Sequence, residues 1–236
     1  MFSYQYAYLV SATLLLFPIW LLLFLHRKDL RQELLLVSIV IGIIGPISEL
    51  WYLQDYWRPE TFNGWTIGVE DFLFGFFIGG IGSVIYEELF GKHFTKRLDR
   101  THHWRWFLIP IVILFLLGLN IPFLYFDINS IYASIIALLV TAAVMMYFRT
   151  DLWGDLFMSG VLVGLIMSVN YLIFLKIFPE AIHRWWELEN ISGILVMGIP
   201  LEELLWAFSW GMVGGPIYEF FTGRKFSRRI ARNKFQ

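Results

Sequence analysis

Residues 68–97 read GVEDFLFGFFIGGIGSVIYEELFGKHFTKR, and residues 200–229 read PLEELLWAFSWGMVGGPIYEFFTGRKFSRR. The second stretch follows the first by 132 places (200 − 68 = 132), and eleven of the thirty aligned positions are identical. Both stretches are largely apolar, yet each has two adjacent acidic residues close to its start. Similarity at one fixed spacing indicates two copies of the same structural unit, so we expect the fold to be built from a repeat.

The composition indicates a protein of the lipid bilayer. Of the 236 residues, 58% are hydrophobic and 19% aromatic, and only 16% are charged, against about 25% in soluble domains. The chain has no cysteine, which excludes disulfides, a thiolate nucleophile and cysteine-based metal sites. The first apolar run lacks a basic leader and a small-residue cleavage site, which favours a membrane anchor over a removed signal. No basic groove for nucleic acid is predicted.

Seven apolar runs reach the length of about 20 residues that a transmembrane helix needs. They cover residues 4–25, 31–53, 66–90, 104–124, 129–148, 155–176 and 192–221. Ahead of the repeated stretch the spacing changes to 122 places, so RKDLRQEL at 27–34 aligns with RTDLWGDL at 149–156. Because three spans reverse the direction of the chain, one linking span must precede a second copy of the same direction. We predict an all-α integral membrane protein with seven transmembrane helices in a 3+1+3 arrangement of two parallel-topology repeats.

The charged residues lie almost entirely in the connections between these spans. With the N-terminus outside, fifteen of the eighteen Lys and Arg residues fall on the cytoplasmic side, including Lys96, Arg97 and Arg229. The positive-inside rule therefore predicts a multi-pass plasma-membrane protein with a cytoplasmic C-terminus, whose basic end contacts anionic membrane lipid. The predicted units are a first repeat at 1–97, a linking helix at 98–127, a second repeat at 128–229 and a basic tail at 230–236.

Charged side chains inside a membrane helix are costly and usually mark a functional site. Parallel repeats face each other across an axis along the membrane normal, so the acid pairs Glu70–Asp71 and Glu202–Glu203 are expected at equal depth. A single acid in the first helical turn is explained most simply as a cap that the helix dipole favours. Paired acids present in both copies favour a catalytic site instead.

Other residues in the same part of the spans extend the predicted site. Neighbouring residues on a helix lie about 100° apart, so one acid of each pair can face the bundle interior while the other faces elsewhere. Glu49 in the second span and Asn170 in the sixth lie near matching outer ends. Aromatic residues share the helix faces of the acids, and we expect a substrate cavity walled by Phe74, Trp206 and Trp210.

Two further repeated features are interpreted as structural. GxxxG spacing, which allows close helix packing, occurs at Gly75/Gly79 and Gly211/Gly215. An Ile-Tyr-Glu sequence ends in Glu87 in one copy and in Glu219 in the other. Both glutamates lie at the predicted cytoplasmic ends of their spans, about 25 Å from the acid pairs. We expect interfacial tyrosine anchors beside solvated glutamates there.

The absence of several motifs limits the classes of reaction that the protein could catalyse. All five histidines lie in connections, no lysine lies midway along the last span, and no Asp-rich motif or dinucleotide-binding glycine fingerprint is present. These absences argue against a di-iron oxygenase, a retinal protein, a magnesium-dependent prenyltransferase and a nicotinamide enzyme. Carboxyl groups and aromatic rings remain. They suit proton-initiated, redox-neutral chemistry on a hydrocarbon, because carboxyls exchange protons and aromatic faces stabilise cations. We expect no cofactor and no metal.

At these residues the chain resembles the heterodimeric-type carotenoid cyclases, the lycopene cyclases of some bacteria, archaea and fungi, whose two three-span subunits occur separately or fused. That family carries a Pro-x-Glu-(Glu/Asp) motif in each half. Pro200-Leu201-Glu202-Glu203 matches the motif fully, whereas Gly68-Val69-Glu70-Asp71 has the acids without the proline. The preceding stretch SELWYLQDYWRPETFNGWTIGVED, residues 48–71, is also similar to the family.

The resemblance implies that a linear, lycopene-like carotenoid in the bilayer is closed to an ionone-type ring. One carboxyl would protonate the terminal double bond, the neighbouring alkene would capture the cation, and a carboxylate would remove a proton. The acids implied are Glu202 and Glu203 first, then Glu70 and Asp71. The missing proline leaves open whether the first motif is catalytic.

Two other functions are compatible with the pattern. A 3+1+3 layout is also that of the sugar-efflux proteins called SWEETs, in which intramembrane acids could couple proton movement to solute transport. A carotenoid hydratase would use similar acid chemistry, and nothing positive favours a non-catalytic membrane partner. The sequence leaves open the ring type, whether one or both ends react, and whether the chain forms a homo-oligomer.

Overall fold

The computed structural model describes residues 3–95, 104–223 and 225–228. The basic residues Lys96, Arg97 and Arg229 and the predicted tail at 230–236 lie outside the described residues. The predicted boundaries at 97, 98 and 229 also fall there.

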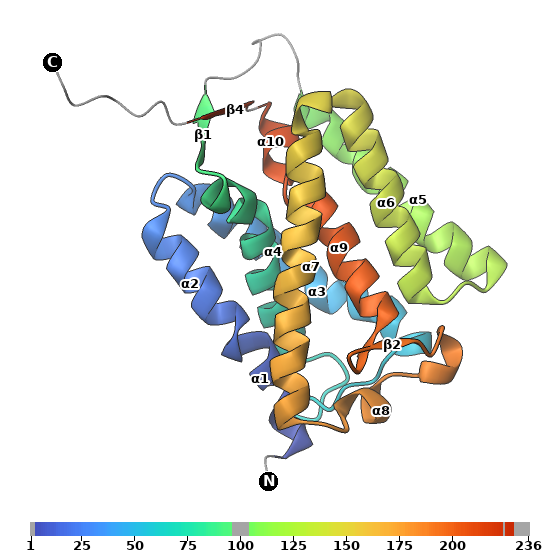
Figure 1. Ribbon diagram of the computed structural model, residues 1–236. Helices are drawn as coiled ribbons and strands as arrows, with labels where there is room; N and C mark the ends of the chain where they lie inside the picture. Colours follow the sequence, from blue (N-terminus) through green and yellow to red (C-terminus); the bar gives the residue numbers. More distant parts are fainter. Residues whose placement is uncertain (1–2, 96–103, 224, 229–236) are drawn as a thin grey trace, which may run out of the picture.

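The first half of the chain forms three helical segments and a short strand (Figure 1). In order, they are η1 (Tyr4–Tyr6), α1 (Ala7–Leu14), α2 (Leu16–His26), α3 (Arg31–Asp55), α4 (Val69–Leu89) and β1 (Lys92–Thr95). The 3-10 turn η1, α1 and α2 follow one another closely enough to form one apolar segment from Tyr4 to His26.

The second half begins with a helical hairpin at one side of the bundle. The elements are η2 (Trp104–Phe107), α5 (Leu108–Phe126), α6 (Ser130–Phe148), η3 (Thr150–Leu152), α7 (Trp153–Ile177), α8 (Ala181–Trp185), η4 (Leu188–Asn190), β2 (Leu195–Val196), β3 (Ile199–Pro200), α9 (Leu201–Gly214), α10 (Ile217–Thr222) and β4 (Lys225–Arg228). Helix α1 and strand β4 lie at opposite ends of the bundle (Figure 1).

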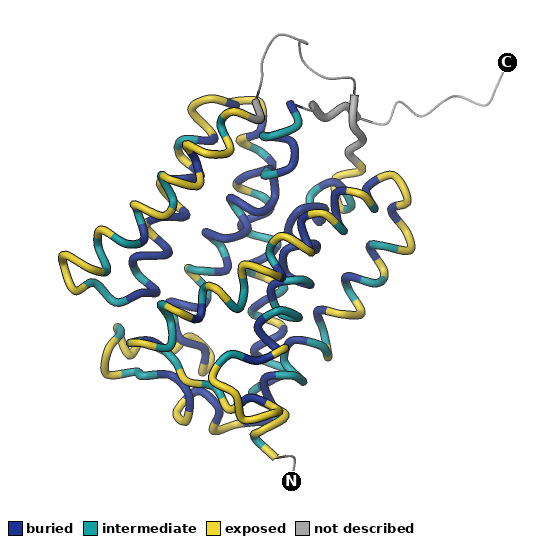
Figure 2. The backbone as a smooth tube through the Cα atoms, turned by 180° about the vertical axis from the view of Figure 1, so that it is seen from behind, coloured by how far each residue is buried: buried dark blue, intermediate teal, exposed yellow. Residues whose placement is uncertain are grey.

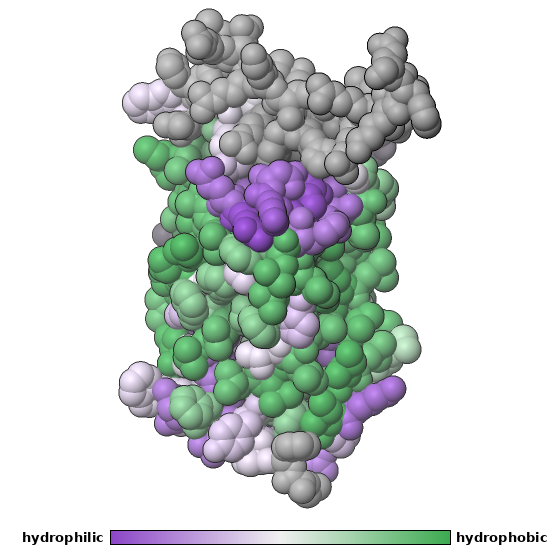
Figure 3. Space-filling view, turned by 90° about the vertical axis from the view of Figure 1, so that its left-hand side faces the viewer, coloured by the Kyte–Doolittle hydropathy of each residue, from purple (hydrophilic) through white to green (hydrophobic). Residues whose placement is uncertain are grey.

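The protein is a multi-pass helical membrane protein. Within the described part of the chain, six helical segments are long and apolar enough to cross a bilayer. Their apolar outer faces form a continuous belt between two hydrophilic ends on the face seen in Figure 3. Buried residues gather where the helices face one another, and exposed residues follow the outer faces (Figure 2). This is the distribution expected where lipid replaces water around the bundle.

The seventh predicted span, residues 192–221, is not one continuous helix. It starts with the hairpin β2–β3, whose two turn residues Met197 and Gly198 both have positive φ, 56° and 85°. Two consecutive residues of this kind are typical of a tight type I′ hairpin turn. Helix α9 then ends at Gly214, and α10 follows Pro216. Proline has no backbone N–H to continue a helix, which explains the break.

Small residues bring the helices of each half into close contact, as the GxxxG spacing predicts. In the first half, a Cβ added to Gly75 of α4 would lie 2.6 Å from the carbonyl oxygen of Ile41 in α3. In the second, a Cβ on Gly211 of α9 would lie 2.5 Å from the carbonyl oxygen of Ser159 in α7. The glycines therefore let two backbones touch at positions where any side chain would separate them.

Replacing Gly75 by alanine is expected to destabilise the protein by about 1–3 kcal/mol, because α3 and α4 must move apart to admit the methyl group. The matched control is Gly82→Ala on the same helix, where the added Cβ would meet its nearest neighbours at 3.7 Å. Thermal unfolding in detergent measures both. Equal melting temperatures for the two variants would contradict the close contact.

Strands β1 and β4 pair antiparallel at the C-terminal end of the bundle, with Phe94 opposite Phe226. These two phenylalanines are equivalent in the repeat (94 + 132 = 226). Pairing of equivalent residues is what a twofold axis between two copies produces. The register agrees with two repeats, while their boundaries and the full 3+1+3 layout stay predictions.

Candidate active site

Helices α4 and α9 both begin at the N-terminal end of the bundle, and each predicted acid pair lies in the first helical turn. Asp71 acts as a helix cap, because its Oδ2 accepts a 2.7 Å hydrogen bond from the backbone N–H of Gly68. Glu203 holds the equivalent position of α9 but makes no cap, since Pro200 stands before the helix and has no N–H to offer. Glu203 is thereby released for other partners.

Those partners are aromatic side chains from three other segments. Glu203 Oε1 accepts a 2.6 Å bond from the hydroxyl of Tyr56 and a 2.8 Å bond from Trp186 Nε1. The phenol of Tyr171 in α7 also interacts electrostatically with Glu203. Glu203 is only 8% exposed, so a buried carboxyl is surrounded by groups that stabilise its charged form.

The loops carrying Tyr56 and Trp186 are locked to each other. The backbone N–H of Glu187 donates to the carbonyl of Tyr56 at 2.9 Å, and that of Arg58 donates to Trp185 at 2.7 Å. Burial raises the pKa of the Tyr56 phenol well above its usual range, and negative charge at Glu203 raises this pKa further. Tyr56 therefore stays protonated and remains a hydrogen-bond donor to Glu203.

Asp71 and Glu49 extend the same buried group. Glu49 of α3 interacts electrostatically with both Asp71 and Glu203, and it accepts a 3.0 Å hydrogen bond from Trp57 Nε1. The phenol of Tyr8 in α1 interacts electrostatically with Asp71 and with Glu49. All three acids are at most 8% exposed. We call Glu49, Asp71 and Glu203 the interior acids.

The interior acids show both the repeat and a departure from it. Asp71 and Glu203 are equivalent at a spacing of 132, whereas Glu49 aligns with Tyr171 at a spacing of 122 (49 + 122 = 171). The first half thus places a carboxyl beside its second acid, and the second half places a phenol there. The site is therefore chemically asymmetric, with two acids from the first half and one from the second.

The first acid of each pair faces a loop instead of the interior. Glu70 Oε1 accepts a 2.6 Å bond from the backbone N–H of Phe62, and Glu202 Oε1 accepts a 3.0 Å bond from that of Ser192. Tyr132 of α6 donates to the same oxygen of Glu202 at 2.6 Å. Both first acids are buried, and each fastens the loop before its own helix.

The aromatic residues predicted as cavity walls do lie together. The rings of Phe74 and Trp206 have centroids 6.3 Å apart, and those of Trp206 and Trp210 are stacked at 6.4 Å. Trp206 Nε1 donates to the hydroxyl of Tyr52 at 3.0 Å, which fixes the plane of the indole. Asn170 is buried and donates at 3.3 Å to Ser11 Oγ on α1, so this hydrogen bond joins two helices and does not reach an acid.

The expectation for the two Ile-Tyr-Glu sequences is wrong in one respect. Glu87 and Glu219 are 1% and 0% exposed, so they are buried and not solvated. Glu87 lies near the end of α4, whereas Asp71 lies in the first turn of the same helix. Helix α10 follows the break at Pro216 and carries Glu219 at a buried position close to Glu87.

Several site residues were not found from the sequence, namely Tyr8, Tyr56, Trp57, Tyr171 and Trp186. Tyr171 could have been predicted from the sequence, because the spacing of 122 places aligns it with Glu49, which was predicted as a site residue. Tyr56, Trp57 and Trp186 lie in loops outside the two aligned stretches 68–97 and 200–229, and only the pairing of those loops brings them to the acids.

An open pocket of about 620 Å³ at the same end is lined by residues such as Arg58, Glu60 and Trp65 and by none of the interior acids.

Replacing Tyr56 by phenylalanine is expected to lower the catalytic rate about 10-fold, because Glu203 loses its shortest donor while Trp186 keeps its contact. Turnover in membranes that contain the protein measures the rate. Tyr125→Phe on the exposed end of α5 is the matched control, since that side chain is 78% exposed. Unchanged turnover in Tyr56→Phe would contradict a functional role for this hydrogen bond.

Part of the chain is similar to a known protein family. The family model described as lycopene cyclase matches residues 129–221, which contain Glu202, Glu203 and their partners Tyr132, Tyr171 and Trp186. No curated protein and no solved structure matches the chain. Residues 129–221 of the chain are therefore similar to the lycopene cyclase family.

Proposed function

We propose that the protein is a redox-neutral intramolecular cyclase that protonates a linear carotenoid end group and closes it to an ionone-type ring. The observation that carries this proposal is the group of interior acids, buried together among phenol and indole donors. Like charges repel strongly in buried surroundings, so this arrangement favours a protonated carboxyl among the three acids. In the proposed reaction this carboxyl supplies the proton.

In the proposed reaction, a protonated interior carboxyl transfers its proton to the terminal carbon–carbon double bond. The tertiary cation that forms is attacked by the neighbouring double bond, and a ring carbon–carbon bond results. A carboxylate then removes a proton from the carbon next to the new cation, and the ring double bond forms. One proton enters and one leaves, so substrate and product are isomers and no electron acceptor is needed.

The two halves supply different parts of this chemistry. Glu203 accepts two hydrogen bonds that favour its charged form, which suits the group that removes the final proton. Glu49 accepts a hydrogen bond from Trp57 and interacts electrostatically with both other acids, which suits proton storage. Asp71 Oδ2 accepts the hydrogen bond of the helix cap, and the other carboxylate oxygen exchanges a proton in this proposal. Glu70 and Glu202 hold the loops that carry the donors.

Aromatic rings beside the acids suit a cationic intermediate. Phe74, Trp206 and Trp210 present adjoining π-faces, and such faces attract a cation by roughly 0.5–2 kcal/mol each. The substrate is a hydrocarbon dissolved in the bilayer, and its end group reaches the acids from the lipid side. In this proposal the interior acids lie toward the outer leaflet, with the C-terminus in the cytoplasm.

Expression in a lycopene-accumulating bacterium, followed by pigment chromatography, tests the proposal. A cyclic carotene should replace lycopene, and the conversion should need no second plasmid-borne protein. A matched culture carrying Glu180→Gln, a change in a loop away from the acids, should convert lycopene equally well.

Two outcomes would contradict the proposal. A hydrated linear carotenoid would show that water captures the cation instead of the neighbouring alkene. Unchanged lycopene, with proton-dependent solute uptake in vesicles of the same membranes, would favour a transporter.

A further inference from the structure

A second group of acids lies buried at the opposite end of the bundle. Glu87 of α4, Asp155 of α7 and Glu219 of α10 each offer a carboxylate oxygen, and these oxygens all lie within 4.8 Å of one another. Their residues are at most 2% exposed. Seventeen helical residues separate Glu87 from Glu70, a rise of about 25 Å, so this group is remote from the interior acids.

The surroundings of Glu87 give the strongest indication that this group of acids binds a ligand. Among the described residues, neither of its carboxylate oxygens has a hydrogen-bond partner, although the side chain is 99% removed from solvent. The side chain nevertheless points toward two other carboxylates. A buried carboxylate left without donors is costly, and a cation between the three oxygens would remove that cost.

The surrounding contacts hold two of the carboxylates in place. Ser159 Oγ donates to Asp155 Oδ1 at 2.8 Å, which sets the orientation of that carboxylate. Arg149 Nη1 donates to the backbone carbonyl of Glu219 at 3.0 Å, which fixes the short helix α10. Contacts of this kind orient metal ligands in known sites.

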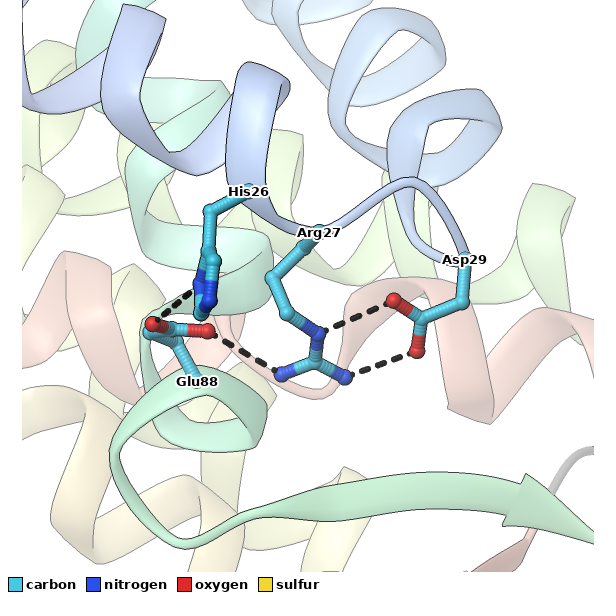
Figure 4. A network of polar contacts seen from close by, with 4 residues as sticks. All are labelled: His26, Arg27, Asp29 and Glu88. Carbon is cyan, nitrogen blue, oxygen red and sulfur yellow. Dashed lines mark hydrogen bonds and ion pairs between the residues drawn. The ribbon is translucent and has the colours of Figure 1, made fainter.

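Two guanidinium groups near this end of the bundle each pair with an acid two residues further along the chain. Arg27 donates to both oxygens of Asp29, at 3.0 and 2.9 Å, and its Nη1 lies 3.4 Å from Glu88, which also contacts His26 (Figure 4). Arg149 repeats this geometry with Asp151, at 2.8 and 2.9 Å. Thus Glu88 turns to Arg27, while its neighbour Glu87 turns inward.

The repeat relates these groups to each other. Glu87 and Glu219 are equivalent (87 + 132 = 219), and Asp155 aligns with Glu33 (33 + 122 = 155), which is also buried. Acids at equivalent positions of both halves therefore meet at one place between α4, α7 and α10. A ligand bound there would join the two halves of the bundle.

We propose that Glu87, Asp155 and Glu219 form a binding site for one hard divalent cation that stabilises the contact between the two halves. The ligands are all oxygens, which magnesium, manganese and calcium prefer. Ligand distances of about 2.0–2.6 Å place two opposite oxygens about 4–5 Å apart, as the spacing of up to 4.8 Å requires. The ion lies too far from the interior acids to take part in cyclisation.

Manganese serves as the probe, because its electron paramagnetic resonance signal separates free from bound ion. Purified full-length protein in detergent, stripped with a chelator, should bind one Mn²⁺ per chain, and added Mg²⁺ or Ca²⁺ should displace it. Glu87→Gln and Glu219→Gln should each weaken binding about 10- to 100-fold. Glu88→Gln, on the neighbouring residue of the same helix, should leave the affinity unchanged.

Thermal unfolding gives a second measurement that does not depend on the variants. Saturating Mg²⁺ or Ca²⁺ should raise the melting temperature of the wild-type protein, since a ligand of the folded state stabilises it. The proposal is overturned if stripped wild-type protein binds no Mn²⁺. It is equally overturned if Glu87→Gln binds as tightly as Glu88→Gln does.

Discussion

Glu203→Gln is expected to lower the rate of ring formation by about 100-fold or more, because amide nitrogen and oxygen cannot take up the proton that a carboxylate removes. Glutamine keeps the size of the side chain and can still accept the hydrogen bonds from Tyr56 and Trp186. The protein should therefore fold and insert normally. Initial rates of lycopene loss and ring formation in isolated membranes, normalised to protein amount, measure the effect.

Glu202→Gln is the matched comparison, since it changes the neighbouring acid of the same motif. In the wild-type protein, Glu202 Oε1 accepts hydrogen bonds from the backbone N–H of Ser192 and from the hydroxyl of Tyr132. The side-chain oxygen of glutamine can accept both of these bonds. A loss of no more than about 10-fold is expected there. A larger loss in Glu202→Gln than in Glu203→Gln would mean that the loop-facing acid performs the chemistry.

Asp71→Asn is expected to reduce turnover by about 100-fold while leaving the melting temperature nearly unchanged. Asparagine can still accept the hydrogen bond from the N–H of Gly68, so the helix cap survives. The carboxyl that interacts with Glu49 is lost, however, and with it a site for proton exchange. Turnover in membranes and thermal unfolding in detergent separate the two effects.

Two further variants complete this experiment. Asp71→Ala should lose both turnover and about 1 kcal/mol of stability, because the cap is removed as well. Glu70→Gln changes the adjacent acid, which contacts the N–H of Phe62, and should retain most of the activity. If Asp71→Asn stays fully active, the first motif has only a structural role.

The proline that distinguishes the two motifs determines which partners the second acid of each motif binds. Before α4, Gly68 offers an N–H that occupies one oxygen of Asp71. Before α9, Pro200 has none, and Glu203 turns to Tyr56 and Trp186 instead. The departure from the family pattern at Gly68 therefore changes how the second acid is used, and it leaves Asp71 in place among the interior acids.

Hydropathy and repeat register were sufficient to predict most of the membrane fold. Six of the seven predicted spans correspond to helical segments, since a run of about 20 apolar residues has few alternatives in a bilayer. The seventh was predicted as one helix because its composition is apolar throughout. Its start is a hairpin and its end breaks at Pro216, features set by local turn geometry that average hydropathy does not register.

The candidate site was predicted in part. Sequence reasoning found the four acids and the aromatic residues Phe74 and Trp206 because they lie within the repeat or its motif. It could not show which acid of each pair faces inward, since that depends on the rotation of α4 and α9. It also missed Tyr56 and Trp186, because the pairing between their two loops brings together residues 130 positions apart.

Solvent deuterium labelling tests the central claim most directly. Membranes containing the protein are incubated with lycopene in D₂O, and the cyclic product is analysed by mass spectrometry. Acid-initiated cyclisation by exchangeable carboxyls predicts one deuterium in each ring formed, and none in lycopene treated with Glu203→Gln membranes. Rings formed without deuterium from solvent would contradict the account, because their hydrogen could not have come from the interior acids.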